Sequence, residues 1–291
     1  MKIVLSRKGF DAVNGGKPSP ILPDGTLLPL PIPDLSETSG ITYADILLRR
    51  GQSIGTIVED LTNQRVRQKH FAHLDPDLRR AAYPRLRGWR PVFGQAGGDQ
   101  THLTLQGVTV SDLFLFFGWF RQVEIAYGRY QYVRKAPNLH VIFGWLQIAQ
   151  TLRVPTCRIP RWAEYHHHFH PPSTSGNWAD NTVYVSGPRL ALNGVETQTN
   201  GGGVFARYND QLRLTRPNQP NRTLWQLPSW FYPRNGRSPL SRHGNMNRWK
   251  SEGPHTVLDS VDLGQEFVFD TEEYPEAIPW VQQLVRWRPH N

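Results

Sequence analysis

Two hydrophobic runs mark the centre of this chain, the first unbroken and the second nearly so. They cover residues 113–117 and 139–143, and each ends in the step Phe-Gly-Trp, so Trp119 and Trp145 take corresponding positions. Such runs predict strands buried on both faces. A glycine within a strand is typical of a bulge or of a close approach by a second backbone or a flat ligand. Two roles for the tryptophans therefore stay open: filling a bent core, or forming a floor on which a nucleobase stacks.

Weaker patterns predict further elements around this pair. We expect two short helices broken near Gly51, and a long irregular region over residues 216–254. Further strands are predicted at residues 2–6, 27–32, 182–185 and 266–270, an antiparallel meander over 190–215, and a C-terminal helix over 274–287. The pattern indicates a single α+β domain over residues 1–291, with a central bent mixed or antiparallel β-sheet, flanking helices and long structured loops.

A basic, glycine-rich loop follows the first predicted strand directly. It contains Arg7, Asp11, Gly15, Gly16 and Ser19. Backbone N–H groups in such a loop can form an anion cradle, although the spacing is neither that of a phosphate-binding P-loop nor that of a dinucleotide fingerprint. Phosphate binding and a purely structural loop both remain open.

A second polar, glycine-rich loop is predicted over residues 93–103. Its Gln95, Gln100 and His102 could read the edge of a base, since an amide donates and accepts hydrogen bonds in one plane. A simple connection is the alternative. If both loops serve one site, Arg7, Asp11 and the Gly15-Gly16 turn should lie in one pocket with these three side chains.

His73 and Asp75 form the first candidate for proton transfer. A carboxylate that orients an imidazole is the arrangement an acid–base histidine needs, and we expect the two side chains to face one cavity. The surrounding Asp-Pro-Asp segment is also ordinary turn and helix-cap chemistry.

Four histidines lie within five residues at positions 166–168 and 170. An extended chain would split such a run between two faces, and metal ligands must converge from one, so we predict no metal ligand here. His167 is a candidate acid–base or hydrogen-bonding group, with a core or surface role as the alternative.

The formal charge of +9 favours polyanionic partners, although a generally cationic surface would show the same excess. Arg234, Arg237, Arg242 and Arg248 lie among aromatic residues of the irregular region. The single Cys157 excludes an intramolecular disulfide. No hydrophobic stretch approaches the length of a signal peptide or a membrane span, so we expect a cytoplasmic protein with no membrane partner.

Several segments together resemble one protein family, the third of the nucleotide-modification-associated domain families of bacteria and phages. They are KIVLSRKGFD, NGGKPSPILPDGTLLPLPIP, AHLDPDL, FGQAGGDQTHL, SDLFLFFGWFR, HVIFGWLQI and EFVFDTEEYPEAIPW, and the resemblance spans nearly the whole chain. It implies association with systems that modify bases in DNA or nucleotides, and it implies no particular reaction or cofactor. The polar positions that match are Ser6, Arg7, Asp11, Gly15, Gly16, Ser19, Asp24, His73, Asp75, Asp77, Gln95, Gln100, His102 and Asp112.

We therefore expect a component of a nucleotide or DNA base modification pathway that binds a phosphate-bearing base, with DNA, nucleotides or other proteins of such a system as partners. Residues 7–19 would hold phosphate, and Trp119 or Trp145 would stack on the base. In an enzyme, His73 with Asp75, or His167, would move the proton. The alternatives are a non-catalytic reader of modified bases and a structural subunit of a modification or defence complex. An enzyme should have ionisable groups with shifted pKa values in one deep pocket, whereas a reader should have an aromatic cage.

Overall fold

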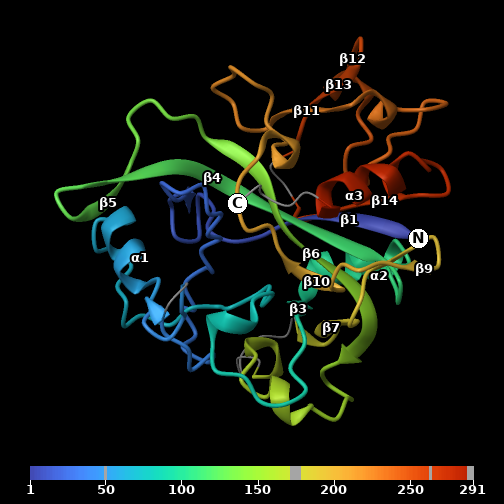
Figure 1. Cartoon of the computed structure of the whole chain (residues 1–291). Helices are drawn as coiled ribbons and strands as arrows, with labels where there is room; N and C mark the ends of the chain where they lie inside the picture. Colours follow the sequence, from blue (N-terminus) through green and yellow to red (C-terminus); the bar gives the residue numbers. More distant parts are fainter. Residues whose placement is uncertain (49–50, 171–177, 262–263, 287–291) are drawn as a thin grey trace.

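The computed structural model of the chain describes residues 1–48, 51–170, 178–261 and 264–286, and Figure 1 shows a sheet running through its middle. Nine strands form this sheet in the order β14-β1-β4-β6-β7-β3, with β10 beside β6 and with β2 and β5 beside β4. The strands are β1 (Lys2–Arg7), β2 (Ser19–Ile21), β3 (Val92–Gln95), β4 (Leu113–Ala126), β5 (Arg129–Tyr132), β6 (Leu139–Arg153), β7 (Thr182–Ser186), β10 (Gly202–Val204) and β14 (Glu266–Asp270). Since β1 and β2 run parallel to β4 and the other pairs are antiparallel, the predicted α+β class with a mixed sheet is confirmed.

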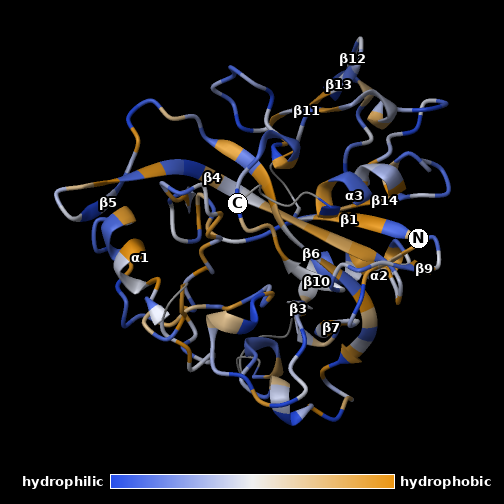
Figure 2. Cartoon of the chain, viewed as in Figure 1, coloured by the Kyte–Doolittle hydropathy of each residue, from blue (hydrophilic) through white to orange (hydrophobic). Residues whose placement is uncertain are grey.

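The two hydrophobic runs lie in β4 and β6, which pair antiparallel with a register shift at Phe116/Phe117. Figure 2 shows hydrophobic residues concentrated along β1, β4 and β6. The glycines of the Phe-Gly-Trp steps allow backbones to approach. A Cβ added at Gly118 would lie 2.6 Å from the carbonyl oxygen of Lys8, and one at Gly144 would lie 2.8 Å from that of Gly203. A second backbone, not a flat ligand, therefore accounts for both glycines.

Three α-helices are present in the described ranges: α1 (Gly55–Leu61), α2 (Gly97–Leu105) and α3 (Ala277–Arg286). α1 packs against β5 and α2 against β14 (Figure 1). α3 confirms most of the predicted C-terminal helix and buries Ile278, Val281 and Leu284 in the cluster of the central sheet, while Trp287 lies outside the described residues. None of the helices in the described ranges is long and apolar enough to cross a membrane.

Short elements occupy much of the remaining chain. One group is the sheet β11-β13-β12, formed by β11 (Leu224–Pro228), β12 (Trp249–Glu252) and β13 (His255–Asp259). Another is the hairpin of β8 (Ala191–Leu192) and β9 (Val195–Glu196). The 3-10 turns are η2 (Arg80–Ala82), η3 (Arg161–Ala163), η4 (His167–Phe169), η6 (Asp210–Leu212), η7 (Ser229–Phe231) and η8 (Met246–Arg248). The three-stranded sheet lies at the top of Figure 1. The region predicted to be irregular therefore contains regular strands.

Three predicted elements are corrected. The described segment 27–32 forms an isolated bridge at Leu27 and no strand, because its prolines remove ladder donors. The meander over 190–215 is absent from the described chain, since β10 joins β6 of the central sheet. The helix expected before Gly51 is replaced, within residues 42–48, by turns and the bridges Thr42↔Phe71 and Leu47↔Ser53.

Candidate active site

A cavity of about 360 Å³ opens where β1 ends. Its volume lies within the range of roughly 300–1,000 Å³ that small-ligand pockets occupy. Most of its wall comes from four segments that are distant in sequence: the end of β1 with the loop after it, the segment at His73, the step from β3 to α2, and the chain at His168 and Trp178. Ile32 and Gln265 complete the wall. The lining residues are Arg7, Lys8, Gly9, Asp11, Asn14, Ile32, His73, Asp75, Gly94, Gln95, Ala96, Gly97, His168, Trp178 and Gln265.

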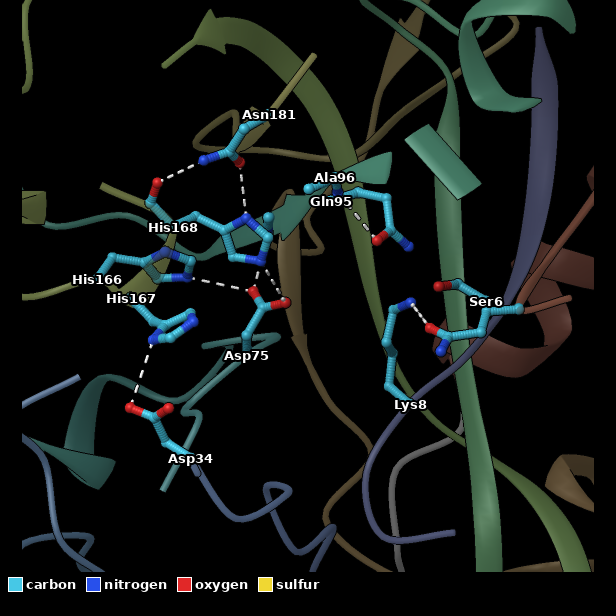
Figure 3. Close-up of polar contacts among 12 residues, drawn as sticks. Ser6, Lys8, Asp34, Asp75, Gln95, Ala96, His166, His167, His168 and Asn181 are labelled. Carbon is cyan, nitrogen blue, oxygen red and sulfur yellow. Dashed lines mark hydrogen bonds and ion pairs between the residues drawn. The ribbon is translucent and has the colours of Figure 1, made fainter. Parts of the chain in front are cut away.

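Asp75 lies at the centre of the histidine-rich wall (Figure 3). Its Oδ1 accepts hydrogen bonds from the backbone N–H of Gly94 at 2.8 Å and from Nε2 of His166 at 3.2 Å. Its Oδ2 lies 3.8 Å from Nε2 of His168. Burial raises the pKa of Asp75, but the hydrogen bond from His166 and the neighbouring imidazoles outweigh burial, so the net pKa falls below its usual value. Asp75 is therefore an ionised carboxylate at neutral pH.

His168 is held by Asn181 on the opposite side of its ring (Figure 3). The Nδ2 of Asn181 donates to the backbone carbonyl of His168 at 2.7 Å, and its Oδ1 lies 2.7 Å from Nδ1 of the same histidine. Because Oδ1 only accepts, Nδ1 carries the proton and Nε2 carries the lone pair. Burial lowers the pKa of His168 to about 4. The ring packs directly over Gly94, where an added Cβ would lie 2.2 Å from Cδ2 of His168.

His73 shares the wall with Asp75, as the sequence predicts, but the expected hydrogen bond between them is not formed. Among the described residues, the buried Nε2 of His73 has no hydrogen-bond partner. Asp75 binds His166 instead. Burial, followed by the adjacent His167, lowers the pKa of His73 well below its ordinary value. The ligand atoms of His73, Asp75 and His168 lie within 4.8 Å of one another, a grouping that could hold a metal ion.

His167 lies behind this wall and not in it. Its ring centroid is 4.0 Å from that of His73, and its Nδ1 is 3.2 Å from Oγ1 of Thr38 and 3.6 Å from Oδ2 of Asp34. Burial lowers its pKa. His167 therefore supports His73, and it is not among the described residues that line the cavity.

Lys8 lines the side of the cavity that lies across from Asp75 (Figure 3), and it pairs with the fully buried Glu266. Nζ of Lys8 lies 2.7 Å from Oε1 of Glu266, which also accepts hydrogen bonds from Ser6 at 3.1 Å and from Nε2 of Gln95 at 2.6 Å. The amide of Gln95 is thus fixed within the wall by an internal hydrogen bond. Arg7 lines the same side, and its Nη2 donates to the carbonyl of Gly264 at 2.9 Å.

The loop after β1 is built by its own polar and glycine residues. Oδ1 of Asp11 accepts from the backbone N–H groups of Val13 at 2.7 Å and Asn14 at 2.6 Å. Gly15 has φ +84° and packs against the Phe10 ring, where a Cβ would lie 2.3 Å from the nearest carbon, so no other residue fits. Asp11 and Asn14 line the cavity, whereas Gly15 sets the turn behind them.

Gly16 and Ser19 were also predicted to bind phosphate in this loop, but their contacts serve the fold. Gly16 continues the turn at φ +66°. Ser19 is buried in β2, where its Oγ accepts a hydrogen bond from the N–H of Leu30 at 3.0 Å. Neither belongs to the described lining of the cavity.

Gln100 and His102 are not in the cavity wall, because residues 93–103 form β3 and the start of α2, not a loop. Oε1 of the buried Gln100 accepts from the hydroxyl of Tyr184 at 3.0 Å. Nε2 of His102 lies 2.9 Å from Oγ of Ser241. Of the residues predicted to share one pocket, Arg7, Asp11 and Gln95 are in the described lining, whereas the Gly15-Gly16 turn, Gln100 and His102 are not.

Trp119 and Trp145 also lie away from the described cavity lining. Trp145 is 9 % exposed, and its Nε1 donates to the carbonyl of Asn200 at 2.9 Å. Trp119 is half-buried under the guanidinium of Arg222, 4.5 Å from its ring centroid. The core role thus accounts for Trp145, and both rings already have packing partners. The aromatic ring that does line the cavity belongs to Trp178, which the sequence patterns did not single out.

Three of the four arginines singled out in the region 216–254 are paired with carboxylates. Arg234 contacts Glu276 at 2.6 Å, Arg242 contacts Asp99 at 3.1 Å, and Arg248 contacts Asp259 at 3.6 Å. Part of the positive charge expected to attract polyanions is therefore neutralised within the protein.

The residues that sequence reasoning missed are His168, Asn181, Lys8 and Trp178. The run of histidines was a usable signal for His168, but the prediction assumed an extended chain. The 3-10 turn η4 brings both His166 and His168 to Asp75, and an extended chain could also place alternate residues on one face.

Comparison with known sequences gives one positive result. Residues 2–270 match the family described as nucleotide modification associated domain 3. The chain matches no curated protein and no solved structure.

Proposed function

Because this chain belongs to the family of nucleotide modification associated domain 3, as its sequence motifs predicted, we propose that it is an enzyme that modifies a nucleotide or a DNA base in the cavity at the end of β1. The observation that supports this proposal most is the set of residues in the wall: His73, Asp75 and His168 line the same cavity as Arg7 and Lys8. Among the described lining residues the aromatic ring is Trp178 alone, apart from the imidazoles. Grouped ionisable residues with shifted pKa values favour an enzyme over a reader, which would need an aromatic cage.

Each side of the cavity suits a different part of such a substrate. Arg7 supplies positive charge for a phosphate, whereas the charge of Lys8 is balanced by Glu266. Trp178 offers a face on which a base can stack. The low pKa of His73 and His168 keeps both imidazoles neutral at pH 7, so each can offer a ring-nitrogen lone pair to a group bound in the cavity. A cavity of this size fits a free nucleotide or a base turned out of a strand, and not a duplex.

Binding is tested by calorimetric titration with deoxynucleoside mono- and triphosphates and with single-stranded DNA at several salt concentrations. Trp178→Ala should weaken binding by about 1–3 kcal/mol with little change in the salt dependence. Arg7→Gln should reduce the slope of log K against log salt by roughly 0.7 for a single strand. Arg129→Gln, an exposed residue of β5 outside the cavity wall, is the matched control. Equal affinities for all three variants and the wild type would contradict binding in this cavity.

Catalysis is tested by mass spectrometry of the DNA nucleosides and free nucleotides of cells that express the protein. We expect a nucleoside of altered mass with the wild type and none with Asp75→Asn, which removes the charge while keeping the side-chain shape. Circular dichroism establishes that the variant is folded. The same altered nucleoside from folded Asp75→Asn would refute the enzymatic role of this wall, and its absence even with the wild type would favour a non-catalytic component.

A further inference from the structure

The two oxygens of Asp75 have different surroundings. Oδ1 already accepts two hydrogen bonds, from the N–H of Gly94 and from Nε2 of His166. Oδ2 lies 3.8 Å from Nε2 of His168, which is too long for a hydrogen bond. The carboxylate is thus anchored by one oxygen and presents the other to the imidazole.

Nε2 of His168, the nitrogen that faces Oδ2 of Asp75, carries a lone pair and no proton. Asn181 fixes the proton of His168 on Nδ1, so Nε2 cannot donate to the carboxylate. The buried Nε2 of His73 has no hydrogen-bond partner among the described residues. Asp75 and His168 therefore face each other with no proton between them, an arrangement that is repulsive unless a cation lies there, and the ligand atom of His73 is within 4.8 Å of both.

We propose that His73, Asp75 and His168 bind a divalent transition-metal ion at the wall of the cavity. Two imidazoles and one carboxylate favour Zn²⁺ or Fe²⁺ over Mg²⁺ and Ca²⁺, which prefer oxygen ligands. Metal–ligand bonds of about 2.1 Å place tetrahedral ligands about 3.4 Å apart. The 3.8 Å between Asp75 and His168 is close to this separation, and the overall spread of 4.8 Å requires a modest inward movement.

The surroundings of the three ligands match those of metal sites that perform catalysis. Such sites have three protein ligands and one position open to the substrate, and all three residues line the cavity. Metal-binding histidines usually donate their second ring N–H to an acceptor, as Nδ1 of His168 does to Asn181. The role of the ion in a reaction rests on the proposed function, whereas its binding does not.

The test measures metal binding to the full chain without nucleotide. After treatment with a chelator, the protein is titrated with Co²⁺, followed by visible absorption, and then with Zn²⁺ and anaerobic Fe²⁺ in competition, with Mg²⁺ as the comparison. We expect one ion per chain. Asn181→Ala should weaken binding about 10–100-fold, and Asp75→Asn and His168→Gln by more than that. His170→Gln, an exposed histidine two residues from His168, should leave the affinity unchanged.

X-ray absorption of the wild-type protein loaded with Zn²⁺ provides a measurement that needs no variant. It should show two imidazoles and at least one oxygen in the coordination shell. The metal site would be overturned if the folded wild type bound no Co²⁺, Zn²⁺ or Fe²⁺. It would also be overturned by an affinity for Mg²⁺ equal to that for Zn²⁺, or by a coordination shell without imidazole. Nucleotide titrations of the metal-free protein, run in parallel, distinguish this failure from failure of the proposed function.

Discussion

His140 of β6 is expected to make the fold sensitive to acid. The residue is 3 % exposed, and its Nδ1 accepts a hydrogen bond from Nε1 of Trp225 at 3.0 Å. Burial, reinforced by the charges of Arg222 and Arg7, lowers the pKa of His140 to about 3. Protonation would remove the acceptor and place a positive charge in the hydrophobic core, so the native state resists it.

The magnitude follows from the difference between the two states. An unfolded histidine has a pKa of about 6.5, so below that pH the unfolded chain binds a proton at His140 that the native chain does not bind. The unfolded state is then favoured, and the free energy of unfolding falls by about 1.4 kcal/mol per pH unit until the pH approaches the native pKa. Between pH 7 and pH 5, His140 alone should lower the stability by about 2 kcal/mol.

Urea unfolding at pH 7, 6 and 5 measures this contribution. His140→Asn removes the titrating group and keeps an acceptor for Trp225, so this variant should lose about 2 kcal/mol less than the wild type over the same interval. His255→Asn, at an exposed position of β13, controls for the loss of a histidine as such. Parallel losses in the wild type and His140→Asn would refute the reasoning.

Two further predictions use neighbouring features as internal controls. Gly94→Ala should displace the ring of His168 and lower the free energy of unfolding by about 1–3 kcal/mol, because the new Cβ would lie 2.2 Å from the ring. Gly98→Ala is the control, since no neighbouring atom lies within 4 Å of its new Cβ, and this variant should be neutral or slightly stabilising in thermal unfolding. Equal effects would contradict the packing described at Gly94. Trp145→Ala should cost about 3–5 kcal/mol as a core truncation, and the half-buried Trp119→Ala should cost less. A loss below about 1 kcal/mol for Trp145 would return it to the candidates for a stacking surface.

The two central strands could be predicted because their own sequence indicates burial on both faces. Largely apolar runs such as 113–117 and 139–143 must be covered on both faces, and all residues of both runs are buried in β4 and β6. The segment 93–103 is a different case, since Gly97 and Gly98 argue against a helix locally. α2 forms there because distant residues support its first turn: Asp180 accepts from the N–H of Gly97 at 3.0 Å, and Asp99 pairs with Arg242.

The candidate site shows the same division between local and distant causes. Sequence reasoning selected His73 and Asp75 as a local pair, and both residues line the cavity. The hydrogen-bond partner of Asp75, however, is His166, which lies 91 positions away. Neighbours in sequence can reveal which chemical groups a segment offers, but packing decides which of them meet. Gly94 is the clearest case, since its N–H anchors Asp75 while its missing Cβ admits the ring of His168. A glycine that the sequence placed in a polar loop thus lies in β3 and contacts both Asp75 and His168.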